Sequence, residues 1–192
     1  MITVSPTTDN ETYTKIPTFK ILLWLAMVSM VMMFAGLTSG YIVRQAESNW
    51  QVIELPVIFY VSTALIILSS ISMQYAFMAV KKDNLAGMRI GLMVTLGLGL
   101  GFAFTQFMSW SHLIDAGIFF TGNPAGSFLY VLTGLHLAHL AGGILYLMVV
   151  TARSIQGKYH SGYNLPVELC TIFWHFLDGL WIYLFIFLLI SQ

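Results

Sequence analysis

The stretch ELCTIFWHFLDGLW, residues 168–181, lies near the C-terminus in an apolar run long enough to cross a bilayer. It nevertheless contains three ionisable residues, Glu168, His175 and Asp178, with Trp174 and Trp181 beside them. Ionisable groups inside a membrane span are costly and usually face a protein partner or a water-filled cavity. We therefore expect a transmembrane helix whose polar side chains are buried against neighbouring helices.

The composition of the whole chain is that of a membrane protein. Of its 192 residues, 58% are hydrophobic and 8% are charged, against roughly 25% charged residues in soluble domains. The formal net charge is zero, which argues against a nucleic-acid partner. The one cysteine, Cys170, lies in the last apolar run, so neither a disulfide framework nor a thiolate metal cluster is expected.

Five segments reach the roughly 20 apolar residues that a transmembrane helix needs. A polar arm over residues 1–18 precedes them, and they are residues 19–43, 55–80, 87–110, 127–152 and 166–190. We expect Pro56 and Pro166 in the first turns of the second and fifth helices, where proline is accepted. The runs lack the alternation of β-barrel strands. The predicted fold is an all-α integral membrane bundle of five helices, forming one domain over residues 19–190.

Positive charges are distributed unevenly between the two sides of this bundle. One side has only Arg44, and the other has seven basic residues: Lys15, Lys20, Lys81, Lys82, Arg89, Arg153 and Lys158. Because cytoplasmic loops carry the excess of Lys and Arg, we predict a cytoplasmic N-terminus and an external C-terminus. Arg153 and Lys158 are candidates for binding anionic lipid headgroups on the cytoplasmic side.

The third span contains a G-x-x-x-G pair, Gly97 and Gly101. Small residues at this spacing let two helices approach closely. The pair indicates either ordinary packing within the bundle or a dedicated dimer face.

Two pairs of polar residues occur at helical spacing in the last two spans. His136 and His139 are three residues apart, as are His175 and Asp178, so each pair lies on one helix face. The pairs could hold a metal ion or a haem between the fourth and fifth helices, or they could be structural groups that hydrogen-bond between helices. The first two spans contain no Asp, Glu or His, so we do not expect a complete proton path.

The polar helices resemble those of subunit III of haem-copper cytochrome c oxidases. Residues 168–181 resemble the family's E-A-A-x-Y-W-H-F-V-D-x-x-W signature, and residues 126–139 resemble its G-S-x-F-x-x-T-G-x-H-x-x-H block. Leu55-Pro56, Ser69-Ser70 and Gln106 also fit the family pattern. The resemblance covers nearly all of residues 19–190.

Two positions depart from that pattern. Met30 stands where the family's S-E-V-M-F-F-A-G segment has a glutamate, and Ser109 stands where a second glutamate is usual. Roles attributed to those two carboxylates are therefore not expected here.

The resemblance implies the five-helix form of a non-catalytic subunit. Such a subunit carries no metal or haem of its own, because haem and copper belong to partner subunits. It contacts mainly subunit I, assembles with subunit II and other respiratory subunits, binds phospholipid between its helices, and supports proton uptake by subunit I. The complex, in a bacterial inner membrane, reduces O2 to water with electrons from cytochrome c and pumps protons.

Within this interpretation, we expect a buried polar network that joins the fourth and fifth helices. Its members are His136, His139, Glu168, His175 and Asp178, and Trp174 and Trp181 supply rigid packing surfaces. Two alternatives remain open. One is subunit III of a quinol oxidase, or an accessory subunit of a nitric oxide reductase. The other is a haem b membrane anchor that uses His136 or His139 together with His175.

Overall fold

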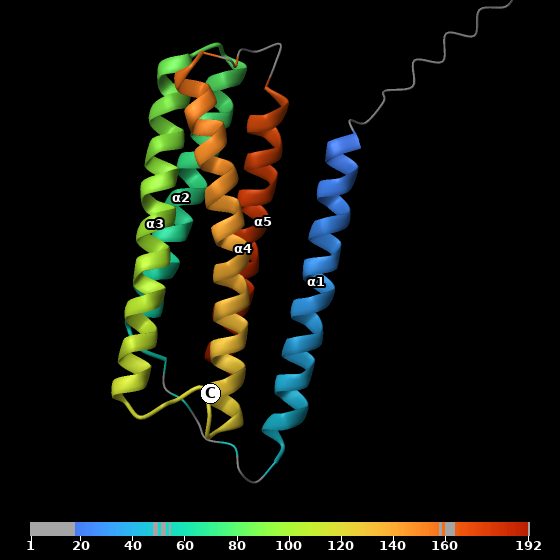
Figure 1. The fold of residues 1–192 in the computed structure, drawn as a ribbon, viewed down its shortest axis with the longest axis vertical. Helices are drawn as coiled ribbons and strands as arrows, with labels where there is room; N and C mark the ends of the chain where they lie inside the picture. The colour runs from blue at the N-terminus through green and yellow to red at the C-terminus, as the bar shows by residue number, and fades with distance from the viewer. Residues whose placement is uncertain are drawn as a thin grey trace, which may run out of the picture.

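The computed structural model describes residues 18–47, 50, 53, 55–157, 159 and 164–191. This part of the chain forms five long helices and no strand (Figure 1): α1 (Thr18–Gln45), α2 (Ile58–Lys81), α3 (Leu85–Asp115), α4 (Pro124–Ile155) and α5 (Leu165–Ile190). Each helix is long and apolar enough to cross a membrane. The predicted all-α bundle of five transmembrane helices is therefore confirmed.

The helix ends differ from the expected ones at the α3–α4 connection and at the start of α2. α3 continues to Asp115 and α4 already begins at Pro124, where the Asn123 side chain accepts a hydrogen bond from the Ala125 backbone N–H. Proline is favoured in the first turn because it lacks a backbone N–H that would be unpaired there, so Pro124 is a local signal for the start of α4. Pro166 lies in the first turn of α5, as expected.

The expectation for Pro56 was wrong. α2 begins at Ile58, so Pro56 precedes the helix, and its carbonyl accepts a hydrogen bond from the Phe59 backbone N–H. The proposed polar arm, apart from Thr18, lies outside the described residues.

α2 and α3 form a closely packed hairpin. A Cβ added at Gly91 of α3 would lie 2.8 Å from the Cβ and 3.0 Å from the Cα of Ala76 in α2, so only glycine permits this approach. Gly97, by contrast, has no described atom within 4 Å of such a Cβ, and Gly101 has only Leu65 at 3.9 Å. The G-x-x-x-G pair is thus not the close contact within the described bundle.

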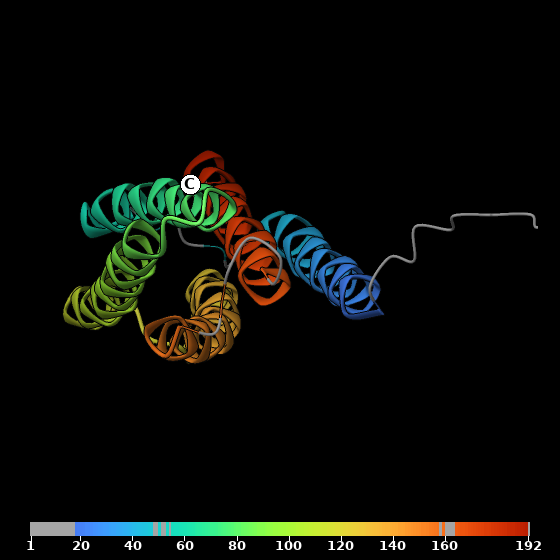
Figure 2. The ribbon, with the colours of Figure 1, turned by 90° about the horizontal axis from the view of Figure 1, so that it is seen from above.

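α5 lies at the centre of the arrangement. It packs against α2 and α4 on one side and against α1 on the other, as the view from above shows (Figure 2). Among the five spans, α5 has the largest buried share of its most apolar segment. The polar residues of α5 are therefore close to three other helices.

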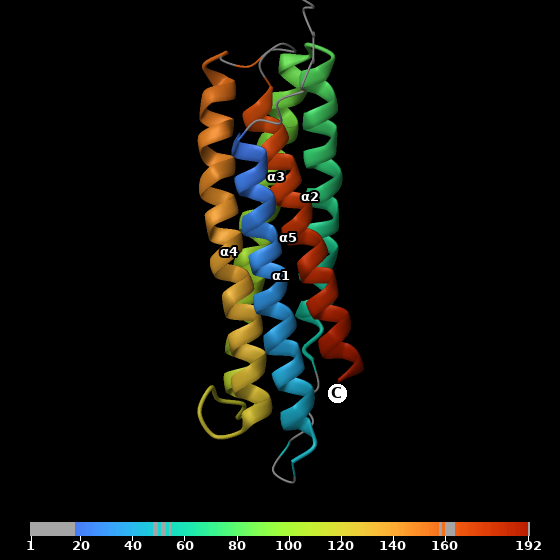
Figure 3. The same cartoon turned by 90° about the vertical axis from the view of Figure 1, so that its right-hand side faces the viewer.

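α1 stands apart from the other helices. Among the described residues it packs only against α4 and α5 (Figures 1 and 3), and only 17% of its most apolar 18-residue segment is buried. A helix with this little burial leaves most of its apolar surface to lipid or to another protein.

Candidate functional site

Trp174 and Trp181 anchor α5 to α2 through their indole N–H groups. Trp174 Nε1 donates to Ser69 Oγ at 2.9 Å, and Trp181 Nε1 donates to Thr63 Oγ1 at 3.1 Å. Both indoles are completely buried. A buried Trp N–H usually needs an acceptor, and here two hydroxyls of one helix supply them.

Two glycines make room for Trp174. A Cβ at Gly99 of α3 would lie 2.8 Å from Trp174 Cη2, and one at Gly143 of α4 would lie 3.7 Å from Trp174 Cε3 and 2.9 Å from Leu177 Cδ1. Trp174 therefore fills a space that α2, α3 and α4 enclose together. What this packing of Trp174 and Trp181 contributes to the function of the protein remains a prediction.

His175 faces α2 rather than α4. Its Nδ1 lies 2.7 Å from Ser70 Oγ, and its Nε2 lies 3.2 Å from Gln74 Oε1. Because an amide oxygen only accepts hydrogen bonds, Nε2 carries the ring proton and Nδ1 accepts from the Ser70 hydroxyl. Both nitrogens of His175 are thus occupied by α2.

Asp178 is buried without a hydrogen-bond partner among the described residues. Asp178 is 3% exposed, and neither of its carboxyl oxygens has a hydrogen-bond partner within the described residues. It lines a cavity of about 280 Å³ together with Ser70 and His175. A buried carboxyl left in this state is unfavourable, so the described chain alone does not complete its environment.

Glu168 pairs with α1. Its Oε1 lies 2.7 Å from Lys20 Nζ, and both side chains are about one-quarter exposed. The pair joins the N-terminal ends of α1 and α5. In the sequence Lys20 indicates only the topology, because no neighbouring residue shows which acid it pairs with.

The two histidines of α4 have different surroundings. His136 is fully buried between two aromatic rings, with centroids 5.9 Å from Phe102 and 5.1 Å from Trp181. Neither of its nitrogens is bonded within the described part of the chain. His139 Nδ1 lies 2.7 Å from the Leu135 carbonyl of its own helix, and its ring contacts Phe34 of α1.

Among the described residues, the hydrogen bonds of the five polar residues lead to different helices, and the network between α4 and α5 remains a prediction. The described hydrogen bonds direct Glu168 to α1 and His175 to α2, while His139 bonds within α4. Glu168 and His175 are seven residues apart and lie on nearly the same face of α5, but two turns apart along it. The helix within reach differs at these two heights: α1 supplies Lys20 to Glu168, and α2 supplies Ser70 and Gln74 to His175. The residues Ser69, Ser70, Gln74 and Thr63, which hold α5, carry no local signal for these contacts.

The residues do not fit the bis-histidine haem alternative. The His136 ring packs at a tilt against Trp181, and His175 has both nitrogens on α2, so the rings do not face one another across a free space. No group of three or more His, Cys, Asp or Glu within the described residues is arranged to hold a metal ion.

The headgroup candidates lie at one end of the bundle. Arg153 is exposed near the C-terminal end of α4. Lys158 lies outside the described residues. The headgroup role of Arg153 remains a prediction.

Comparison with known proteins decides the family. Residues 7–191 match the family model described as cytochrome c oxidase subunit III. The chain belongs to the cytochrome c oxidase subunit III family. It is accordingly subunit III of a haem-copper oxidase and assembles with other oxidase subunits.

Bacterial relatives agree with this family. The chain is 33% identical over 175 residues to cytochrome c oxidase subunit 3 of Thermostichus vulcanus, covering 88% of this chain and 86% of the relative. It is 31% identical over 169 residues to probable cytochrome c oxidase subunit 3 of Nocardia farcinica, covering 85% and 82%. With five apolar helices and bacterial relatives, this subunit III is a multi-pass protein of a bacterial membrane.

The two departures from the subunit III pattern have apolar or self-contained surroundings. Met30 lines a pocket with Leu23 and Phe173. Ser109 is fully buried, and its hydroxyl donates to the Thr105 carbonyl one turn earlier at 2.9 Å. Neither side chain therefore needs a charged partner among the described residues.

Proposed function

We propose that this chain is the non-catalytic subunit III of a proton-pumping cytochrome c oxidase, where it stabilises subunit I and its proton uptake and binds phospholipid. The observation that supports this most directly is the mode of α1 packing. α1 is joined to α5 at both ends, by Lys20–Glu168 and by the 3.0 Å Thr38–Tyr183 hydroxyl contact. Between these points the two helices leave apolar pockets that open to the membrane.

One pocket has the character of an acyl-chain site. It has a volume of about 460 Å³ and is lined by residues from α1, α4 and α5: Phe19, Leu22, Leu23, Ala26, Met30, Tyr146, Leu169 and Phe173. Ligand pockets of this size are usually apolar with a few polar groups at one end. Lys20 and the exposed Arg153 lie at this end of the bundle, so we propose that they and Lys158 attract an anionic headgroup.

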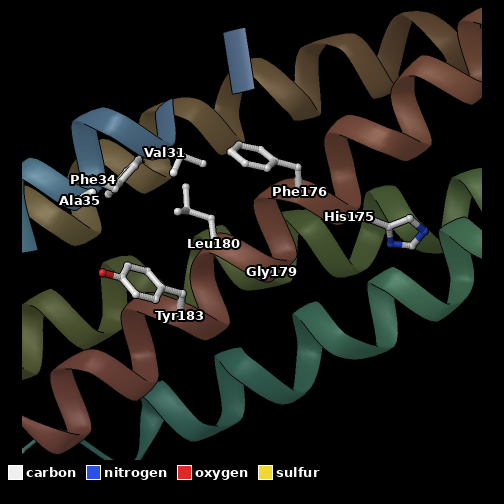
Figure 4. Close-up of a pocket in the computed structure, with 8 residues that line it drawn as sticks. All are labelled: Val31, Phe34, Ala35, His175, Phe176, Gly179, Leu180 and Tyr183. Atoms are coloured by element: carbon white, nitrogen blue, oxygen red, sulfur yellow. The ribbon is translucent and has the colours of Figure 1, made fainter. Parts of the chain in front are cut away.

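The second pocket between α1 and α5 is also apolar. Its volume is about 460 Å³, and Phe34, Phe176, Leu180 and Tyr183 lie around it (Figure 4). We propose that a second lipid chain or a hydrophobic side chain of a neighbouring subunit occupies this space.

Filling the first pocket tests the lipid proposal. Ala26→Trp places a large ring in the pocket, whereas Met32→Trp alters the outer face of α1, where Met32 is 71% exposed. We expect the purified complex to lose about one tightly bound phospholipid with the first variant and none with the second, measured by lipid mass spectrometry. Equal lipid content in both complexes would contradict the proposal.

Mild-detergent purification of the tagged chain tests the assigned complex. We expect subunit I and a copper-bearing subunit II to copurify. The purified complex should show a haem spectrum and should oxidise cytochrome c. Copurification with a quinol-oxidising partner or a nitric oxide reductase would reassign the electron donor or the reaction. Haem bands carried by the isolated chain, and lost on His175→Ala, would replace the proposal with a haem anchor.

A further inference from the structure

A groove that contains several polar side chains runs between α2 and α5. We call it the α2–α5 groove and define it by Ile67, Ser70, Ile71, Gln74, His175 and Asp178. Two cavities of about 540 and 280 Å³ adjoin along it and share Ser70, Ile71 and His175. In Figure 4 the His175 ring extends away from the α1 residues Val31, Phe34 and Ala35.

The groove presents hydrogen-bonding groups at the middle of two membrane spans. Ser70 lies near the midpoint of α2, and His175 and Asp178 lie near the midpoint of α5. Gln74 is exposed, and the Asp178 carboxylate is buried with both oxygens unbonded among the described residues. Acyl chains cannot hydrogen-bond, so lipid filling this groove would leave these groups unsatisfied.

The shape of the groove suits a helix rather than an acyl chain. Gly179 is exposed, and a Cβ built there meets no described atom within 4 Å. Together with Ser70 it forms a small-residue surface, and such surfaces let a neighbouring backbone approach closely in membranes.

We infer that the α2–α5 groove receives a transmembrane helix of another subunit of the same oxidase, which directs a hydrogen-bond donor side chain toward Gln74 and Asp178. This inference rests on the proposed function, because it requires the chain to work within an oxidase complex. The donor is specified by complementarity, because the carboxyl oxygens of Asp178 and the amide oxygen of Gln74 accept hydrogen bonds. The partner helix therefore carries a hydroxyl, amide or basic group at mid-membrane depth.

Site-specific photocrosslinking in the assembled complex tests the inference. A benzophenone amino acid replaces Ile71 of the groove, which is 63% exposed, or Phe104 on the outer face of α3, which is 65% exposed. After irradiation of native membranes, we expect position 71 to crosslink to a membrane-spanning oxidase subunit and position 104 to give mainly lipid adducts. Lipid adducts alone at position 71, or subunit crosslinks at 104 but not 71, would overturn the inference.

A second measurement removes the exposed Gln74 amide, and with it the acceptor of His175 Nε2 within this chain. Gln74→Leu changes an exposed side chain, and Ser29→Leu removes an exposed polar group from α1 as the control. From typical hydrogen bonds between membrane helices, we expect roughly three- to tenfold faster loss of this subunit from the detergent-purified complex for Gln74→Leu alone. Equal loss rates for both variants would count against the groove. If the wild-type chain never copurifies with oxidase subunits, the proposed function fails, and not merely this assignment.

Discussion

At the scale of single residues, Trp174 determines how closely three helices can approach α5. Its indole is fully buried, and its N–H is fixed by Ser69 of α2. The ring therefore cannot move away when a neighbouring atom is added. Gly99 lies against this ring, and Gly97, two residues earlier, faces outward.

Gly99→Ala should destabilise the protein, whereas Gly97→Ala should not. The new Cβ at position 99 would lie 2.8 Å from Trp174 Cη2, and overpacking of this kind costs about 1–3 kcal/mol. At position 97 no described atom lies within 4 Å. Thermal unfolding of the two variants in the same detergent measures the difference, and equal stabilities would refute the packing argument.

Asp178 is the second residue with a specific expectation. Asp178→Leu removes a buried carboxyl that has no bonded partner in the described chain, so the isolated subunit should become more stable, by about 1–3 kcal/mol. The assembled complex should instead lose the subunit sooner or have a shorter active life, with an unchanged haem spectrum. Unfolding of the subunit and turnover of the complex provide the two measurements. An altered haem spectrum with normal subunit retention would contradict this view.

At the scale of elements, α1 is the helix with the weakest attachment. Its C-terminal end is held by Thr38–Tyr183 and by Gln45 Nε2 donating to the Ser191 carbonyl at 3.0 Å. At its N-terminal end, Lys20–Glu168 is the ion pair among the described residues that joins it to α5. The two ends can therefore be loosened separately.

Lys20→Met should loosen only the N-terminal half of α1. A partly exposed pair contributes roughly 0.2–1 kcal/mol. Its loss is too small to change the fold but large enough to broaden the distribution of distances between α1 and α5. Electron–electron distance measurements between spin labels on the two helices would detect this broadening near residue 22 and none near residue 42. Arg44→Gln, which removes the local Arg44–Glu47 pair, is the matched control and should leave both distances unchanged.

At the scale of the whole molecule, the charged ends of the bundle predict its orientation. Lys20, Lys81, Lys82, Arg89 and Arg153 lie at one end, shared by the start of α1, the α2–α3 turn and the end of α4 (Figure 1). Arg44 lies at the other. The positive-inside bias is therefore also a bias between the two ends of the folded structure.

Reporter fusions test this orientation. A fluorescent protein fused after residue 83 should fluoresce, because that turn is predicted to be cytoplasmic, and alkaline phosphatase fused after residue 122 should be active outside. The reverse pattern would show that the charge bias does not set the orientation of this chain. A silent reporter at one site is resolved by the complementary reporter at the same site.

Some features of this protein are set by neighbouring residues, and others by residues far apart in the sequence. The five spans were predictable because hydropathy is summed over neighbouring residues. Their ends were less predictable: the starts near Pro56 and Pro124 and the end of α3 at Asp115 differ from the expected ones. The pairing of the polar residues was not predictable, because Glu168 meets Lys20 and His175 meets Ser70 across 148 and 105 residues. Helical spacing gives a face but not the neighbour of that face.

The sequence by itself determined the membrane class, the five helices, the charge asymmetry and the family signature around residues 168–181. Only the tertiary structure decided that this stretch bonds to α1 and α2, that Asp178 has no hydrogen-bond partner among the described residues, and that α1 stands apart. The physical reason is that lipid and the interior of a helix bundle are equally apolar. Hydropathy therefore identifies a span but cannot distinguish its lipid-facing side from its protein-facing side.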